Sequence, residues 1–175
     1  MKAISTWQPH AWLFGRGKEY ETRAYPVPGG YRGPIAIHAS KTLQECKDIE
    51  EIITRFRGAA WPEQGYNFSR TFHQVFGEHI KQNGILTKGL RLENFLAFGA
   101  VVAIGELTAC YDAPKLWGKL ASPSREFGDF GQGRYAWRIE NVRILKTAYP
   151  LRGQQKLWDL PPHIADELMN AEKET

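Results

Sequence analysis

The stretch Lys18-Glu19-Tyr20-Glu21-Thr22-Arg23 places an amine, two carboxylates and a guanidinium within six residues. Because alternate residues of a strand point to the same face, Glu21 and Arg23 share a face if the chain is extended from Tyr20 onward. The long side chain of Lys18 can reach over that face from the preceding turn. Such a group of charges is either a solvated strand edge or a functional site, and the rest of the sequence has to separate the two.

Length, composition and cysteine content bound the class of protein. The chain has 175 residues, of which 42% are hydrophobic and 13% aromatic, and this is typical of one globular domain. No apolar run approaches the roughly 20 residues that span a bilayer, and residues 1–5 lack the apolar core of a secretion signal. Cys46 and Cys110 lie far apart and outside any CxxC pair, so neither a disulfide framework nor a zinc site is indicated. We therefore expect a soluble, cytoplasmic, single-domain protein without a metal or other cofactor.

Charge is distributed unevenly along the chain. The formal net charge is +4 overall, but residues 1–34 carry +3, residues 134–156 carry +5 and residues 158–175 carry −4. Two basic segments and an acidic tail suit a polyanionic ligand such as nucleic acid. An arginine-rich strand can equally be no more than a soluble face, so charge alone leaves both interpretations open.

Hydrophobic periodicity and turn residues predict the order of helices and strands. Thr42 as N-cap, Glu45 three residues later and apolar residues at helical spacing predict a helix over 42–57. An apolar, β-branched run predicts a central strand over 98–110, and Glu140-Asn141 interrupts an extended segment over 135–145 in the manner of a bulge. The remaining expected elements are a short helix over 9–14, extended chain over 21–25, a strand over 33–38, helices over 68–82 and 90–96, and a helical tail over 161–171. Strands at both ends with helices between them indicate an α+β barrel with a helical insertion at about 42–96 and a C-terminal tail at about 159–175.

Further stretches complete a family pattern around the opening motif. They are Met1–Pro9, Tyr31–Lys41, Phe127–Phe130, Gly133–Val142 and Gly153–Trp158. Together with Lys18–Arg23 they resemble the ASCH domain family of the PUA-like superfamily, in particular a microbial and phage branch of it. The family motif Gly-x-Lys-x-x-Glu-x-Arg is matched by Lys18, Glu21 and Arg23, while its glycine falls on Arg16. The resemblance implies a small PUA-like mixed β-barrel with flanking helices that binds RNA or another nucleic acid.

The resemblance also implies a cleft beside Lys18, Glu21 and Arg23 that holds a nucleotide or a splayed base. Arg23 can hold a phosphate through its planar fork, and Arg134 can line the mouth of the cleft. We therefore predict that the protein binds RNA, or a modified nucleotide or nucleoside. Bases stack on aromatic side chains, although such side chains in a small barrel more often belong to the core. The aromatic candidates are Trp7, Tyr25 and Trp137.

A first alternative is hydrolysis of an amide. Some relatives within the family are amidohydrolases that remove the acetyl group from 4-acetylcytidine with a lysine, a threonine three residues later and a strand glutamate. The lysine corresponds to Lys18, Glu21 stands where the threonine is expected, and Glu106 is the best match for the strand carboxylate. Lys18 acts as base or nucleophile only if its pKa falls from about 10.4 toward neutrality, and nearby carboxylates act in the opposite direction. Strong burial is therefore a condition of catalysis by the free amine, whereas a charged Lys18 can still polarise a carbonyl or stabilise an oxyanion while Glu21 or Glu106 activates water.

A second alternative is cleavage of RNA without a metal ion, with Glu21 as base and Lys18 and Arg23 as cations beside the phosphate. The three residues can also form an ion-pair network that only braces the strand. Among these interpretations we place ligand binding without chemistry first, and the alternatives stay open.

Overall fold

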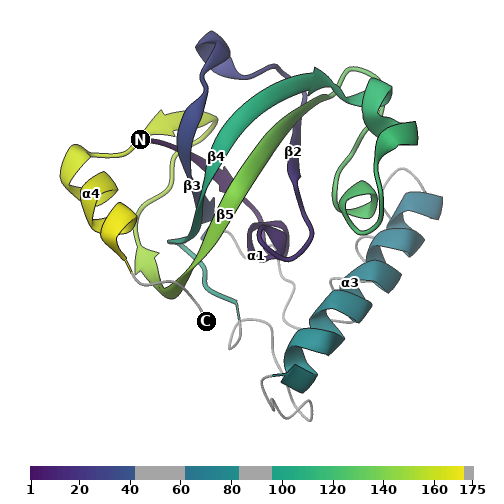
Figure 1. The fold of residues 1–175 in the computed structure, drawn as a ribbon, viewed down its shortest axis with the longest axis horizontal. Coiled ribbons are helices and arrows are strands. Elements are labelled where there is room, and N and C mark those ends of the chain that lie inside the picture. The colour runs from purple at the N-terminus through teal and green to yellow at the C-terminus, as the bar shows by residue number, and fades with distance from the viewer. Residues whose placement is uncertain (42–61, 83–95, 172–175) are drawn as a thin grey trace. The chain divides into compact units, whose positions relative to one another are not determined.

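The computed structural model describes residues 1–41, 62–82 and 96–171 (Figure 1). The chain divides into two compact units, residues 43–96 and the remainder. The helix α3 (Pro62–Gln82) belongs to the unit 43–96. The other unit contains β1 (Lys2–Thr6), α1 (His10–Leu13), β2 (Tyr20–Arg23), η1 (Pro28–Gly30), β3 (Gly33–Ala39), β4 (Ala100–Asp112), η3 (Ala113–Lys119), η4 (Ser124–Phe127), β5 (Tyr135–Pro150), β6 (Leu157–Asp159) and α4 (Pro162–Asn170).

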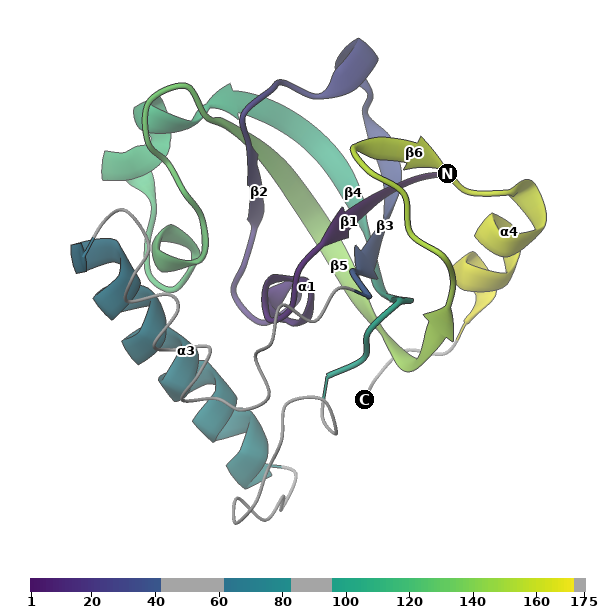
Figure 2. The ribbon, with the colours of Figure 1, turned by 180° about the vertical axis from the view of Figure 1, so that it is seen from behind.

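The six strands form one mixed sheet in the order β2-β5-β4-β3-β1-β6. Strands β1 and β3 pair in parallel, and the other neighbours pair antiparallel. The sheet curls into a half-barrel, so that the edge strand β2 turns toward β1 (Figure 2). The side chain of Arg23 on β2 spans this opening, because its Nη2 donates a hydrogen bond to the carbonyl oxygen of Ser5 on β1 at 2.8 Å. A polar side chain therefore joins strands that the sheet itself does not pair.

Apolar side chains cover both faces of the curled sheet. The inner face is filled by a core that includes Phe14, Ile35, Ile37, Leu107 and Trp137. The outer face carries a second core that includes Ala36, Val101, Leu145, Ile164 and Leu168. Because the last two belong to α4, this helix is the outer layer that covers the β1, β3 and β4 side of the sheet (Figure 1).

The predicted bulge lies in the long strand β5. Ile104 pairs with Arg143 and Glu106 pairs with Glu140, so β5 contains one residue more than β4 between these two pairs. Asn141 takes up the extra length with a φ of 51°. Opposite the bulge, a Cβ on Gly105 would lie 2.7 Å from Cγ2 of Ile139. Only glycine allows β5 to approach β4 this closely at the bend.

Most elements predicted from the sequence are present, with different boundaries. The sheet and helices confirm an α+β fold with a barrel-like sheet, and β3, β4 and α4 lie where strands and a helix are expected. Helix α3 ends at Gln82 as predicted but begins at Pro62, six residues before the predicted start. The helices predicted over 42–57 and 90–96 fall almost wholly outside the described residues. The strands β1 and β6, of five and three residues, are not among the elements predicted from the sequence.

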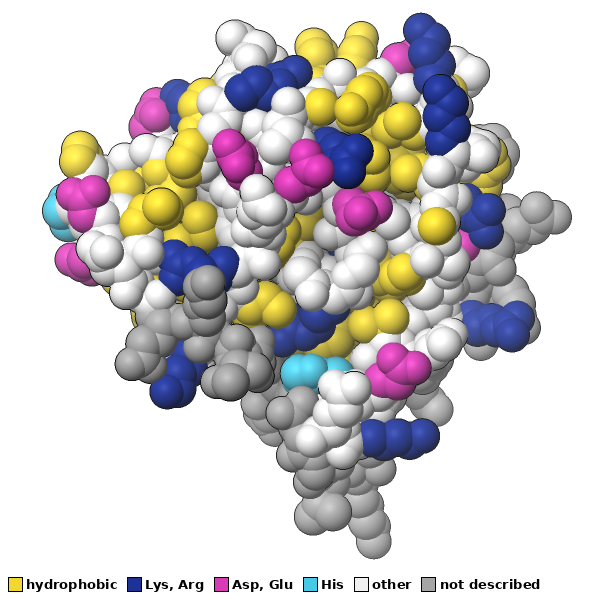
Figure 3. Space-filling view, in the orientation of Figure 1, with side chains coloured by type: hydrophobic (Ala, Val, Ile, Leu, Met, Phe, Trp, Pro, Cys, Tyr) yellow, Lys and Arg dark blue, Asp and Glu magenta, His cyan; other side chains and the backbone are white. Residues whose placement is uncertain are grey.

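The arginines of β5 and the residue just before it are largely engaged within the protein. Arg134 contacts Asp129 at 2.7 Å and Arg138 contacts Glu140 at 3.0 Å. Arg143 donates hydrogen bonds to the last carbonyl groups of α4, at 2.6 Å for Leu168 and 3.0 Å for Met169, and also to Ala171. Basic and acidic side chains accordingly alternate on the face shown in Figure 3. The three arginines over residues 134–143 thus do not form one open basic surface.

None of the helices in the described parts of the chain is long and apolar enough to cross a membrane.

We expect Arg143→Ala to loosen α4 from the sheet. The substitution leaves the C-terminal carbonyl groups of α4 without their cationic donor, and hydrogen bonds to charged groups contribute about 1.5–3 kcal/mol. Urea denaturation should show a loss of that size in the free energy of unfolding. Arg152→Ala removes an exposed arginine from the same basic segment and serves as the control. Equal midpoints for the two variants would contradict this role of Arg143.

Candidate functional site

The charged cluster, defined here as Lys18, Glu21 and Arg23, forms where α1 turns into β2. Glu21 forms ion pairs with both cations: its Oε1 lies 2.8 Å from Nη2 of Arg23 and its Oε2 lies 3.6 Å from Nζ of Lys18. Glu21 and Arg23 share the inner face of β2, and Lys18 reaches them from the turn, as strand alternation predicts. Lys18 and Glu21 are only 4% and 5% exposed. The structure therefore shows a buried network in place of a solvated strand edge.

A segment far along the chain buries Lys18. Residues 122–130, called here the covering segment, include η4 and the turn after it. The Nζ of Lys18 donates a hydrogen bond to the carbonyl oxygen of Phe127 at 2.5 Å. The backbone N–H of Asp129 donates to Oγ1 of Thr22 at 2.9 Å, which fixes the segment against β2. Gly17, with a φ of +103°, allows the covering segment to pack closely against the turn before β2, because a Cβ on residue 17 would lie 2.4 Å from Cγ of Pro123.

Burial sets the direction of the pKa shift of Lys18. Desolvation of the amine lowers its pKa below the ordinary value of 10.5, and the positive charge of Arg23 acts in the same direction. The carboxylate of Glu21 opposes the shift but does not reverse it. The condition that the sequence analysis sets for a reactive amine, strong burial, is therefore met in the structure.

His10 is a member of the site that the sequence analysis did not consider. Its pKa lies well below 6.5, first because the ring is desolvated and then because Lys18 and Arg23 repel a further positive charge. His10 is consequently neutral at physiological pH. No spacing pattern links it to the motif, because it is the first residue of α1 and reaches the cluster only through the fold.

The side chain of Arg23 connects the cluster to the surface. It is 25% exposed, whereas the side chains of Lys18 and Glu21 are 3% and 7% exposed. One nitrogen, Nη2, donates to Ser5 and contacts Glu21, while the buried Nε has no hydrogen-bond partner. With His10 neutral, Arg23 and the protonated form of Lys18 face one carboxylate here. This excess of positive charge, with an unused donor, can hold an anionic oxygen.

The three aromatic candidates occupy different environments. Trp7 is 58% exposed at the end of β1, two residues beyond the Ser5 carbonyl that Arg23 contacts. Tyr25 is partly buried and lies edge-on to Trp137, with ring centroids 5.7 Å apart. Trp137 has no exposed surface and donates its Nε1 hydrogen to the carbonyl of Tyr25. Trp7 is thus available to a ligand, whereas Trp137 is a core residue and is left out of the site.

The two remaining candidates lie apart from the charged cluster. Glu106 is exposed and accepts a hydrogen bond from Asn141 at 3.4 Å. It pairs across the sheet with Glu140, three residues from Trp137, so it lies on the face opposite to Glu21. Arg134 contacts Asp129 of the covering segment and does not reach Lys18 in the described contacts. In the parts of the chain that the structure describes, no group of three or more His, Cys, Asp or Glu side chains is placed to hold a metal ion.

The lowered pKa of Lys18 predicts a pH-dependent contribution to stability. Between the pKa of the folded protein and that of the unfolded chain, the unfolded chain holds a proton that the folded protein has released. The stability of the wild type relative to Lys18→Met should therefore rise as the pH increases toward the ordinary lysine pKa of 10.5. Urea denaturation over this range measures it, with Lys115→Met, at an exposed lysine, as the matched control. A stability difference between the wild type and Lys18→Met that stays constant or falls with pH would contradict a lowered pKa of Lys18.

The geometry defines a buried amine and a shared carboxylate at the base of the site and a partly exposed guanidinium at its surface. Neither a search of protein-family models nor a search of curated proteins finds a match for the chain. The residues of the charged cluster and their surroundings are therefore the basis for assigning a function.

Proposed function

We propose that the protein is a PUA-like domain of ASCH type that binds RNA, or a modified nucleotide, at Arg23 beside Lys18 and Glu21. The observation that carries the proposal is the excess of positive charge in the charged cluster, with a buried Arg23 Nε that has no hydrogen-bond partner. A buried donor without a partner costs free energy, and a bound oxygen would satisfy it. A phosphate or a base carbonyl supplies such an oxygen.

Trp7 supports a nucleotide over a simple anion. Its ring is one of few large apolar side chains that the described surface exposes, and it lies near the Arg23 contact along β1. A base that stacks on an exposed aromatic ring gains about 1–3 kcal/mol. A phosphate at Arg23 with its base on Trp7 uses both features, whereas inorganic phosphate uses only one.

The engagement of other arginines supports this location. Arg134, Arg138 and Arg143 all contact carboxylates or helix carbonyl groups within the protein. A polyanion that bound along β5 would have to compete with these partners. Arg23 also has a carboxylate partner, and an unused buried Nε is a feature that it shares with Arg138. The second cation Lys18 and the exposed ring of Trp7 nearby are what distinguish Arg23.

The binding test uses a fluorescent single-stranded RNA and its anisotropy. Trp7→Leu should weaken binding by roughly 5- to 150-fold, the equivalent of the stacking energy. Arg23→Gln should weaken binding and lower the salt dependence by about one phosphate contact. Lys119→Gln, which removes the same charge from an exposed position, is the control, and circular dichroism checks folding. Equal losses for Arg23→Gln and Lys119→Gln would reject the proposed contact.

A second candidate function, amide hydrolysis on an acylated cytidine, is favoured by the lowered pKa of Lys18. A neutral Lys18 amine can act as the base that takes a proton from a water attacking the acyl carbonyl, with Glu21 beside it to stabilise the ammonium that forms. When the C–N bond breaks, the Lys18 ammonium can return the proton to the leaving amine of the cytidine, which releases the acyl group as a carboxylic acid. Thr22, which is adjacent to the position of the threonine in the related amidohydrolases, lies on the face of β2 opposite to Glu21, where its hydroxyl accepts a hydrogen bond from the N–H of Asp129. Glu106 has no part in this candidate mechanism, since it lies on the opposite face of the sheet.

Mass spectrometry of a short RNA with one 4-acetylcytidine separates this candidate from binding alone. An amidohydrolase should release the acetyl group with the wild type and not with Lys18→Met. RNA fragments that depend on Lys18 would instead identify the ribonuclease alternative. RNA that stays intact at high protein concentration would reject both reactions for this substrate and leave the binding proposal standing.

A further inference from the structure

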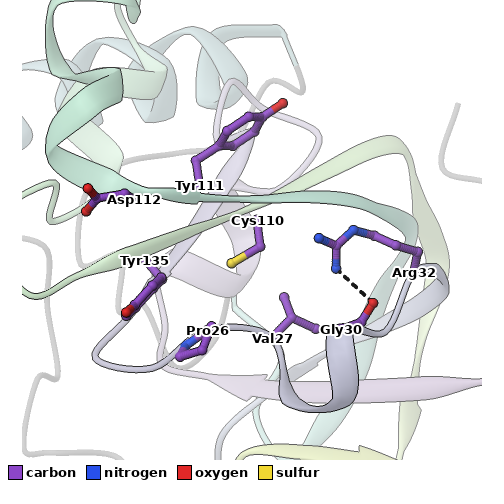
Figure 4. A pocket seen from close by; sticks show the side chains of 8 residues that line it. All are labelled: Pro26, Val27, Gly30, Arg32, Cys110, Tyr111, Asp112 and Tyr135. Atoms are coloured by element: carbon purple, nitrogen blue, oxygen red, sulfur yellow. Dashed lines mark hydrogen bonds between the residues drawn. The ribbon is translucent and has the colours of Figure 1, made fainter.

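We infer a second nucleotide subsite in a pocket of about 240 Å³ at the ends of β4 and β5. The thiol of Cys110 points into the hollow between Tyr135, Pro26 and Val27, and the guanidinium of Arg32 extends over it from the opposite side (Figure 4). This inference rests on the proposed function and extends it. It specifies that the ligand is an oligonucleotide that contacts the protein through more than one unit.

The dimensions and lining of the pocket fit a single ring system. Sites for drug-sized ligands usually have volumes of roughly 300–1,000 Å³, so a pocket below that range accommodates one base and not a whole nucleotide. Tyr135 and Pro26 offer ring surfaces for stacking, and Val27 and Cys110 complete an apolar floor. The sugar and phosphate of the same unit would then lie outside, at the rim where Arg32 is placed.

Arg32 is oriented toward this rim by the backbone. Its Nη1 donates to the carbonyl of Gly30 at 3.2 Å and to that of Tyr31 at 2.7 Å. Both bonds use the same nitrogen, so the other guanidinium donors stay available for a phosphate. No carboxylate of the described residues pairs with Arg32. The nearby acid, Asp112, contacts Lys115 at 3.2 Å and points away from the hollow (Figure 4).

The register of the sheet connects the pocket with the charged cluster. Arg23 pairs with Tyr135, and Glu21 pairs with Trp137, which in turn pairs with Cys110. Cross-strand partners lie on the same face, with Cβ atoms about 5 Å apart. Arg23 is therefore the neighbour of Tyr135 on the inner face of the half-barrel. A single strand of RNA can place one unit at the charged cluster and another in the pocket.

The thiol of Cys110 reports directly on occupancy of the pocket. Its rate of alkylation by iodoacetamide, read by peptide mass spectrometry, should fall when a base covers it. We expect adenosine 5′-monophosphate or a short oligoadenylate to slow alkylation of the wild type. In Arg32→Gln the nucleotide concentration that gives half protection should rise about tenfold, as for loss of a charged hydrogen bond. Arg152→Gln, an exposed arginine outside the pocket, should behave as the wild type.

The outcomes separate the subsite from the proposed function. RNA that binds in the anisotropy assay but leaves Cys110 alkylation unchanged would overturn the subsite and retain the proposed function. Protection by the mononucleotide without any RNA affinity would overturn the inference that the occupant is a unit of an oligonucleotide, and it would reject the RNA form of the proposed function. Protection by the oligonucleotide alone would support an RNA unit as the occupant. Equal protection by adenosine or by inorganic phosphate would overturn the assignment to a nucleotide.

Discussion

The carboxylate of Glu21, shared between Lys18 and Arg23, is the interaction on which the site and the closure of the sheet both depend. Removing two or more charges from water is expensive, and replacing a buried ion pair with apolar groups is often neutral or stabilising. Arg23 has a structural reason for its position, because it joins β2 to the Ser5 carbonyl on β1. Lys18 makes no such connection between strands. Its burial beside Glu21 is therefore the feature that the fold explains least and a function explains best.

Because the covering segment buries Lys18, binding at Arg23 and catalysis at Lys18 require different structural changes. A ligand can contact the exposed part of Arg23 and the ring of Trp7 in the described structure, and only a contact with the buried Nε needs a local displacement. An acyl group that reaches Nζ of Lys18 has to replace the Phe127 carbonyl and displace a segment held by Thr22. Binding at Arg23 thus requires a smaller change of the observed structure than a reaction at Lys18 does. This difference places binding first among the proposed functions.

The sequence predicted the residues of the cluster but not their environment. Alternation along a strand is local, so it placed Glu21 and Arg23 on one face correctly. The burial of Lys18 depends on Phe127, more than a hundred residues away, and only the fold shows that desolvation outweighs the carboxylate in setting its pKa. Alternation likewise does not say which face of a strand is inside. It identified the strands of Trp137 and Glu106, whereas their places in the core and on the opposite face follow from the cross-strand pairing.

Blocks of charge in a sequence predict a polyanion site only if the side chains remain available after folding. The most basic segment of this chain uses Arg143 to bind the end of α4, and it uses Arg138 in a contact with Glu140. Arg32, from a segment with a smaller charge excess, has only backbone carbonyl partners among the described residues. Carbonyl groups orient a guanidinium without neutralising it, so its charge still attracts an anion. The partners of each arginine, more than the number of arginines, therefore indicate where a phosphate can bind.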